Sequence, residues 1–385
     1  MSNYGLHVVF LPKWYPDKFD PQNGVFIQKH AWAVSLYAHV TILYATTDDS
    51  INKPQFEEKQ ISDKLTEIRL YYPPRKLPLI GKALTAMRYT ELMLAKLKAF
   101  NLKKKIDVIH AHVLLRPALI ARWYALNNNI PYLISEHWSG YGRGLFDKRS
   151  ILAKFLSRKV MAEASVVSTI SPFLKDTMIA CGLKANYFTI PNVVDIDTNS
   201  IKKKNPDKTI YLTIGDLNDS IKNISGIIKV FSRVIEINND VELHIIGGGY
   251  DEPDLMELAN DIGILGKQVI FHSRQNHDYV MAFLPKADVY INNSRFETFS
   301  VTVAEAAANK IPVITTKCGG PQSFFDKRMG IEIPVDDDEA LLVAMKTMLA
   351  THKQYQLDET AAHIKNMFSA ETVGRQFYEL YKSVI

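Results

Sequence analysis

The chain has 385 residues, 47% of them hydrophobic and 23% charged, an ordinary composition for a globular protein long enough for two domains. No run of 18 apolar residues is present to span a membrane, the net charge of +5 is mild, and we expect no nucleic-acid partner. Two cysteines, Cys181 and Cys318, do not make a disulfide framework, and no Cys/His cluster has the spacing of a zinc site. A reducing, cytoplasmic compartment is therefore expected.

The first half of the chain alternates apolar, β-branched segments with helical patterns. The N-terminus has no basic region before the apolar segment at His7, which favours a core strand over a signal peptide. Strands are predicted at 7–11, 40–44, 108–111, 132–135, 166–170 and 187–190, and helices at 26–36, 83–100, 117–126, 151–163 and 172–180. This alternation predicts a mostly parallel sheet with helices on both faces.

A basic segment lies within this half. Between Arg75 and Lys105 there are nine basic residues and one acid, Glu91, with leucines, Met87 and Phe100 interleaved. Such a segment is typical of a helix on an anionic membrane surface, and also of a helix packed on its own domain with a solvated basic face. The first interpretation predicts peripheral contact with the inner face of a membrane.

The alternation restarts after a lysine-rich polar segment, 195–208, which we interpret as an interdomain linker. Strands are predicted at 210–214, 242–246, 269–271, 289–292, 313–315 and 331–333, and helices at 225–237, 253–261, 279–284, 300–309, 321–325, 338–351 and 370–385. The predicted domains are 1–195 and 196–369, with the helix 370–385 packing back on the first. Two Rossmann-like, doubly wound α/β domains would face each other across a crevice at the carboxyl ends of their strands.

Two carboxylates, Glu297 and Glu305, frame the start of a predicted helix in the second half. Glu297 lies in the polar loop after a strand, Ser300 or Thr302 can cap the helix, and Glu305 lies within it. The free N–H groups at the helix start suit an anion, and carboxylates suit sugar and ribose hydroxyls. An isolated pair of this kind would more often be ordinary surface charge.

The surrounding motifs resemble those of the retaining GT-B glycosyltransferases, in particular the large family-four group. The resemblance covers nearly the whole chain and rests on the order and spacing of many short pieces. These pieces are Asn23–Phe26, Asp107–His112, Ser135–His137, Ile170–Pro172, Ile190–Asp195, Gly215 with Lys222, Gly247–Gly249, Glu297 with Glu305, Pro312–Thr316 and Gly319–Pro321.

The resemblance implies a role for each matching residue. Glu305 would bind the ribose of a UDP- or GDP-sugar, Glu297 would face the donor sugar, and backbone N–H groups at Phe299–Ser300 would contact the diphosphate or sugar. Lys222 would neutralise the departing diphosphate. Three glycines would border the bound nucleotide: Gly24, Gly215 and Gly247.

Three further candidates lie in the first half of the chain. His112, at the carboxyl end of its strand, would sit near the donor sugar, and His137 near a saccharide or lipid-linked acceptor. His110, two residues before His112, is interpreted as a core histidine. Trp138 and Tyr141 belong to a glycine-rich aromatic loop that suits an acceptor sugar, although such aromatics can equally tuck into the domain.

The resemblance implies transfer of a hexose with retention, without cofactor or metal, in polysaccharide or glycolipid synthesis. The chain departs from the family pattern at Asp216, where an arginine is usual, at Val193 and at Asn309, where glycines are usual. An aspartate repels phosphate, so Lys222, helped by Lys310 or Arg274, would have to serve. Alternatives are a nucleotide-sugar epimerase or a phosphorylase of the same fold, or a subunit that binds nucleotide sugar without catalysis.

Overall fold

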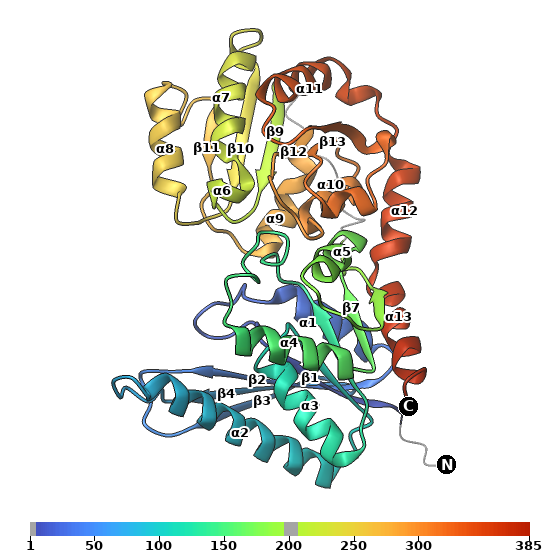
Figure 1. Ribbon diagram of the computed structural model, residues 1–385. Coiled ribbons are helices and arrows are strands. Elements are labelled where there is room, and N and C mark those ends of the chain that lie inside the picture. Colours follow the sequence, from blue (N-terminus) through green and yellow to red (C-terminus); the bar gives the residue numbers. More distant parts are fainter. Residues whose placement is uncertain (1–4, 196–206) are drawn as a thin grey trace. The chain divides into compact units, whose positions relative to one another are not determined.

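The computed structural model of the chain describes residues 5–195 and 207–385, and most of the predicted linker lies outside these ranges. The chain forms two compact units. Unit 1 contains the described residues up to Val193 together with Ala370–Ile385, and unit 2 contains those of Val194–Ser369. The chain therefore leaves unit 1, builds unit 2, and returns to unit 1 for its last helix (Figure 1).

Unit 1 is built on an eight-stranded sheet in the order β3-β4-β2-β1-β5-β6-β7-β8. Its strands are β1 (His7–Pro12), β2 (His39–Thr47), β3 (Gln55–Ser62), β4 (Leu65–Tyr72), β5 (Val108–His112), β6 (Tyr132–Glu136), β7 (Val166–Thr169) and β8 (Tyr187–Thr189). Every pair is parallel except β3–β4, an antiparallel hairpin at the edge. Pro12 pairs with His112, so β1 and β5 end side by side.

The helices of unit 1 lie in two groups. They are α1 (Val25–Ser35), α2 (Gly81–Lys103), α3 (Pro117–Asn128), α4 (Ile151–Glu163), α5 (Pro172–Ala180) and α13 (Ala370–Lys382). Helices α1 and α13 pack on each other, whereas α3 packs on β5 and contacts both α2 and α4. Gly374 makes the close contact of α13 possible, since a Cβ there would lie 2.1 Å from the carbonyl oxygen of Ala33 in α1.

Unit 2 has a six-stranded, wholly parallel sheet in the order β11-β10-β9-β12-β13-β14. Its strands are β9 (Thr209–Ile214), β10 (Val241–Ile246), β11 (Val269–Phe271), β12 (Val289–Asn292), β13 (Val313–Thr316) and β14 (Gly330–Ile333). The order runs outward from β9 in one direction and then continues from β12 in the other. This is the doubly wound arrangement, and it confirms the predicted fold class.

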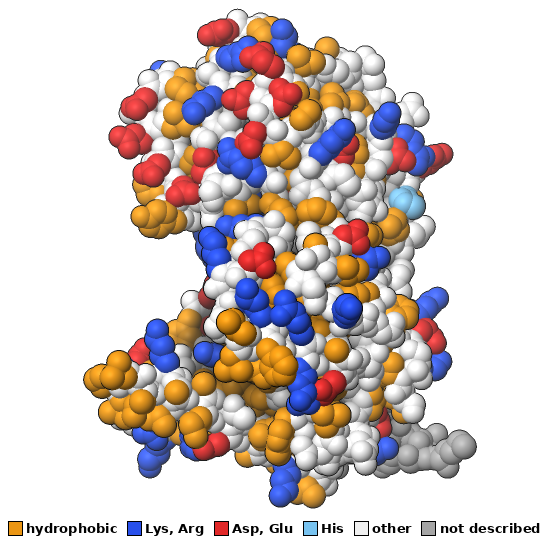
Figure 2. Space-filling model, in the orientation of Figure 1, with side chains coloured by type: hydrophobic (Ala, Val, Ile, Leu, Met, Phe, Trp, Pro, Cys, Tyr) orange, Lys and Arg blue, Asp and Glu red, His pale blue; other side chains and the backbone are white. Residues whose placement is uncertain are grey.

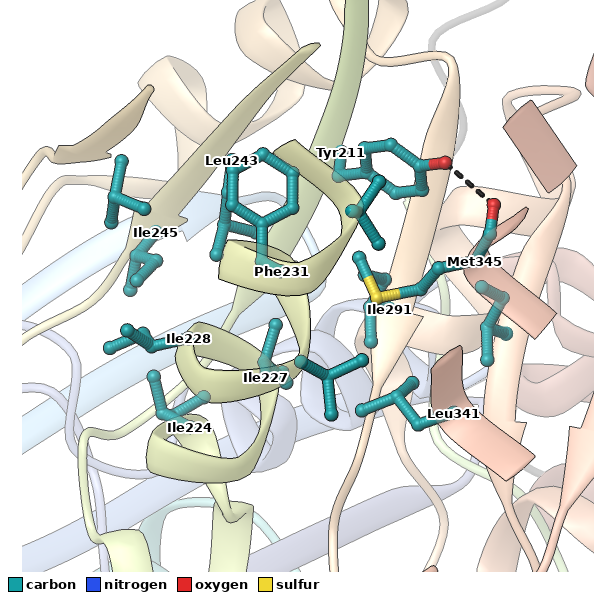
Figure 3. Packing of buried hydrophobic residues seen from close by; sticks show 14 of the residues in the cluster. Tyr211, Ile224, Ile227, Ile228, Phe231, Leu243, Ile245, Ile291, Leu341 and Met345 are labelled. Carbon is teal, nitrogen blue, oxygen red and sulfur yellow. Dashed lines mark hydrogen bonds between the residues drawn. The ribbon is translucent and has the colours of Figure 1, made fainter. Parts of the chain in front are cut away.

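The helices of unit 2 are α6 (Asp219–Lys222), α7 (Ile224–Ile235), α8 (Glu252–Asp261), α9 (His277–Phe283), α10 (Val301–Ala308), α11 (Asp338–Thr351) and α12 (Asp358–Phe368). The core of the unit lies between its sheet and the layer formed by α7, α8 and α11. Figure 3 shows Ile227 and Phe231 of α7 directed toward strand residues such as Leu243. Tyr211 of β9 donates a hydrogen bond of 2.8 Å to the carbonyl of Met345, which ties α11 to the sheet.

The structure differs from the predicted elements, and three of the differences concern whole elements of regular structure. The β3–β4 hairpin was not predicted, because every residue of β3 is exposed and the strand lacks an apolar pattern. Helix α12 was not predicted, because it begins in a charged segment without a side-chain cap. The helix predicted at 321–325 is a four-residue 3₁₀ turn, Gly320–Ser323, because the chain turns sharply at Gly319, where φ is 112°. Among the described residues, no helix is long and apolar enough to cross a bilayer.

Candidate functional site

The polar residues of unit 2 gather where β9 and β12 end. The strand order reverses between these two strands, so the connections that follow them diverge and leave room for a ligand. The connection after β9 carries Gly215 and leads to Lys222, and the connection after β12 carries Glu297 and leads to α10. The structure thus brings predicted residues that are far apart in sequence to one edge of one sheet.

Lys222 and Glu297 form an ion pair at this edge. The Nζ of Lys222 lies 2.5 Å from Oε1 of Glu297, and both side chains are largely buried. Desolvation acts to lower the pKa of Lys222, but the charge and hydrogen bond of Glu297 outweigh it and raise the pKa above its usual value. The lysine stem passes over Gly215, where a Cβ would lie 3.2 Å from Cε of Lys222. The site therefore holds a permanently charged ammonium group.

The backbone on either side of Glu297 is fixed by the turn after β13. The N–H of Glu297 donates to the carbonyl of Cys318 at 2.9 Å, and the N–H of Gly320 donates to the carbonyl of Glu297 at 2.8 Å. A Cβ at Gly320 would lie 2.3 Å from the backbone nitrogen of Phe299, so only glycine fits. Burial, and next the charge of Glu297, raise the pKa of the Cys318 thiol to about 11, which keeps this neighbour neutral.

Helix α10 begins with Ser300 in the left-handed conformation, with φ 67° and ψ 78°. The prediction that Ser300 or Thr302 caps this helix is wrong, because the left-handed backbone turns the serine away from the first N–H groups and Thr302 instead accepts from the hydroxyl of Tyr290 at 2.7 Å. Within the part of the chain that the structure describes, the buried Ser300 hydroxyl has no hydrogen-bond partner. The helix start therefore offers backbone N–H groups and its positive dipole end to an anion.

Two further residues define the walls of this edge. Phe299 is buried, and its ring packs against Phe324 and Phe368 with centroids 5.2 and 5.1 Å apart. Glu305, within α10, is only 3% exposed, and its Oε1 lies 4.0 Å from Nε2 of His277. Sequence reasoning missed His277, which follows the helix-capping Asn276. A buried carboxylate at this depth suits a ligand that brings hydroxyl donors.

The glycines after β10 close the site on the side of β9. A Cβ at Gly247 would lie 1.8 Å from the carbonyl oxygen of Gly215, so these two connections pack backbone to backbone. Asp216 follows Gly215, and the guanidinium of Arg274 lies 3.9 Å from its carboxylate, with both side chains mostly exposed. Arg274 thus brings a positive charge beside the position where the resembled family usually has an arginine.

Unit 1 places three histidines together near the ends of β5 and β6. The ring nitrogens of His30, His112 and His137 that face one another lie within 4.8 Å, and this group could hold a metal ion. Neither ring nitrogen of His112 or of His137 has a hydrogen-bond partner among the described residues. Nε2 of His30 lies 3.1 Å from the carbonyl oxygen of Pro191, which directs its Nδ1 lone pair inward.

Burial governs the protonation of these rings. Desolvation first, and then the neighbouring histidines, hold the pKa of His112 and of His137 well below the usual value, and burial lowers the pKa of His30 to about 4. The cluster is therefore neutral at pH 7 and can donate to or accept from hydroxyl groups. His110 differs, because its two nitrogens bond Tyr381 and Ser135 at 2.7 Å each, as a core histidine would.

Glu136 organises the loop beside these histidines, and sequence reasoning missed it although it ends β6 between Ser135 and His137. Its carboxylate accepts hydrogen bonds from the N–H groups of His137, Trp138 and Leu114 and from the hydroxyl of Tyr141, at 2.8 to 3.0 Å. Tyr141 is buried by this contact, whereas Trp138 is partly exposed and lies under the guanidinium of Arg149. The structure thus gives Tyr141 a supporting position in the loop.

Gly24, at the start of α1, has φ 68°. A Cβ there would lie 2.4 Å from the backbone of Trp14, so the loop after β1 packs directly on the helix start. This contact accounts for the glycine by packing, and a phosphate near it stays a prediction.

Residues 195–364 match the family described as glycosyl transferases group 1, and residues 34–198 match glycosyltransferase family 4. Alpha-monoglucosyldiacylglycerol synthase of Streptococcus pneumoniae is 24% identical over 371 residues, which cover 90% of this chain and 79% of that protein. TuaC of Bacillus subtilis, a putative teichuronic acid biosynthesis glycosyltransferase, is 23% identical over 399 residues, 97% of this chain and 95% of that protein.

Solved structures share the fold at low identity. Sucrose-phosphate synthase from Thermosynechococcus elongatus has a TM-score of 0.77 at 18% identity, covering 98% of this chain and 99% of that one. Anabaena HepE, in complex with UDP and glucose, has a TM-score of 0.68 at 14% identity, covering 98% and 100%. The matches to both halves and the two doubly wound sheets agree, and the chain belongs to the GT-B glycosyltransferases, with a group 1 C-terminal half and a family 4 N-terminal half.

Proposed function

We propose that this glycosyltransferase moves a hexose from a UDP- or GDP-sugar to an acceptor hydroxyl, with retention at the anomeric carbon and without a metal ion on the diphosphate. The observation that carries the proposal is the cation and the helix start at one edge of unit 2. Lys222 and the N–H groups of α10 supply the positive potential that a departing diphosphate needs. Glu305, buried behind them, supplies acceptors for ribose hydroxyls.

Glu297 has two roles in this proposal. It neutralises Lys222 in the ion pair, and with a bound donor it would share the ammonium group with the diphosphate while facing the sugar hydroxyls. Ser294 supports it, since the serine Oγ lies 2.8 Å from Oε1 of Glu297. We further propose that neutral His112 and His137 of unit 1 bind hydroxyl groups of the substrates.

The acceptor we propose is a saccharide or lipid-linked molecule, used at a membrane surface in polysaccharide or glycolipid synthesis. The relative from Streptococcus pneumoniae is named for a diacylglycerol product. Helix α2 buries Tyr89, Met93 and Leu97 against unit 1, while its basic residues stay largely on the outside. Figure 2 shows hydrophobic side chains gathered at the end of unit 1 where α2 begins, with lysine and arginine side chains beside them.

The test is a screen of UDP- and GDP-sugars by thermal shift, followed by release of nucleoside diphosphate in the presence of diacylglycerol or a saccharide. We expect Glu305→Ala to lose donor binding and Glu297→Gln to keep binding but lose transfer by a hundredfold or more, on the order seen when one electrostatic group is removed. Glu257→Gln, at an exposed position of α8, is the matched control. Near-wild-type transfer by Glu305→Ala would overturn the proposal.

The same assay separates the competing functions. EDTA should leave transfer unchanged, and an EDTA-sensitive rate restored by a divalent ion would contradict metal-free catalysis. A binding subunit without catalysis, which Asp216 favours, would release no nucleoside diphosphate with any donor. An epimerase would interconvert nucleotide sugars in the absence of acceptor.

A further inference from the structure

Unit 1 contains a cavity of about 460 Å³ that none of the predicted site residues lines. Its walls come from the ends of β1, β2 and β4, from α2 and from the start of α3. Because parallel strands end on the same edge, residues far apart in sequence meet there. Lys13, Arg116, Tyr72 and Tyr89 are the polar residues of interest.

The cavity is lined by two cationic side chains, Lys13 and Arg116. None of the described residues that line it is acidic. Lys13 and Arg116 have no hydrogen-bonded or ion-paired side-chain partner within residues 5–195 and 207–385, and the Lys13 ammonium contacts only the ring of Trp14, at 5.0 Å. Burial lowers the pKa of Lys13, Glu136 partly offsets this, and Arg149 and Arg116 lower it further. Two cations beside one cavity, Lys13 half-buried and Arg116 exposed, favour an anion as the ligand.

The backbone next to the cavity has several residues with positive φ. Val113 and Leu115 have φ 72°, and Arg116 has φ 26° with ψ −73°. Left-handed conformations cost non-glycine residues of order 1–3 kcal/mol and gather at ligand sites. The loop is held in place by the N–H of Leu114, which donates to Glu136 at 2.8 Å. The strain aims Arg116 and the first turn of α3, which starts at Pro117, at the cavity wall.

We propose that this cavity binds a phosphoryl group of the acceptor, a phosphomonoester or phosphodiester held by Lys13 and Arg116 beside the start of α3. The inference rests on the proposed function and narrows its acceptor to a phosphorylated one. The buried rings of Tyr72 and Tyr89 form the wall on the side of β4 and α2, and their hydroxyls have no hydrogen-bond partner among the described residues. A phosphate with three acceptor oxygens matches these donors.

The phosphate could belong to a lipid headgroup or to a free sugar phosphate. The connection between β4 and α2, which joins Tyr72 to the helix of Tyr89, carries exposed Leu77, Leu79 and Ile80. An exposed apolar loop beside a cationic cavity suits a phosphate that projects from a membrane. The two sources therefore differ in whether this loop contributes to binding.

The experiment measures binding of glycerol 3-phosphate by isothermal titration, with UDP present at saturation so that the nucleotide site of unit 2 is filled. We expect binding to weaken at least tenfold in Lys13→Met and in Arg116→Met, and glycerol to show no binding. Lys148→Met, at an exposed position of the same unit, should match wild type. Unchanged thermal stability and UDP affinity of the cavity variants would show that they are folded.

The inference would be overturned if wild type and both cavity variants bound glycerol 3-phosphate with equal affinity. It would also be overturned if the cavity variants lost UDP binding, because the cavity would then belong to the donor site. If the wild-type protein binds UDP but not glycerol 3-phosphate, only this inference is contradicted. If it binds glycerol 3-phosphate but not UDP, only the proposed donor site is contradicted.

A second experiment, with vesicles of phosphatidylcholine and phosphatidic acid, distinguishes the two sources of the phosphate. If the phosphate belongs to a lipid headgroup, the double variant Leu79→Ser with Ile80→Ser should bind these vesicles more weakly than wild type. If it belongs to a free sugar phosphate, the double variant should bind them as wild type does.

Discussion

Lys222 stays charged mainly because of its neighbour Glu297. The ion pair with Glu297 is largely buried, so either side chain without the other would be a desolvated and unpaired charge. The two charged groups therefore stabilise each other. Under the proposed function, a donor diphosphate would compete with Glu297 for the same ammonium group.

This dependence predicts how pH affects nucleotide binding. Glu297 raises the pKa of Lys222 against desolvation, so its removal in Glu297→Gln leaves desolvation dominant and the pKa falls. UDP affinity of the variant should therefore decline as the pH rises toward 9, while wild type holds its affinity to higher pH. Titration of UDP across this range checks it, and parallel pH curves for the two proteins would contradict the assigned ion pair.

The histidine cluster of unit 1 predicts a pH dependence of stability. His30 has a folded-state pKa of about 4, below the usual 6.5, so the unfolded chain binds the proton more tightly and stability is lost as the pH falls below about 6.5. For His30 alone the loss from pH 7 to pH 5 is about 2 kcal/mol, and His112 and His137 act in the same direction.

Thermal unfolding between pH 7 and pH 5 measures this effect. The triple variant with glutamine at His30, His112 and His137 should lose less stability on acidification than wild type. His363→Gln, at an exposed position of unit 2, is the control and should follow wild type. An identical pH dependence of wild type and triple variant would show that the cluster is not the cause.

Among the elements, α13 packs closely on α1 at Gly374. A methyl group at Gly374 would meet the carbonyl oxygen of Ala33 at 2.1 Å, so Gly374→Ala must push α13 away from α1. We expect a destabilisation of about 1–3 kcal/mol, the usual cost of overpacking. Denaturant unfolding checks this, with Gln376→Ala at an exposed position of the same helix as the control. A neutral Gly374→Ala would mean that the helix pair tolerates separation.

Most elements could be predicted because their apolar periodicity is strong. The strands that end at His112 and Asn292 are short and fully buried, and predicted site residues lie at or after their carboxyl ends. The β3–β4 hairpin could not be predicted, since β3 is exposed along its whole length and carries no alternation. The cavity was missed because Lys13 and Arg116 become neighbours only through the pairing of β1 with β5.

At the scale of the molecule, the charge of α2 predicts salt-dependent membrane binding. Helix α2 is packed on unit 1 through Tyr89 and Met93, so its basic residues can meet anionic lipid without any rearrangement. Pelleting with anionic vesicles should fall with ionic strength and fall further in Lys82→Glu with Lys98→Glu. Lys353→Glu with Lys365→Glu, at exposed positions of unit 2, makes the same change of charge elsewhere. Equal pelleting of the two double variants would contradict a membrane role for α2.

The return of the chain to unit 1 has a consequence for biosynthesis. The core of unit 1 includes Val373, Phe377 and Tyr381 of α13, which the ribosome makes only after the whole of unit 2. Unit 2 is continuous, so it can fold as it emerges, whereas the earlier strands of unit 1 must wait with an apolar face uncovered. The part of the protein translated first is therefore the part completed last, and the nascent chain needs protection for that interval.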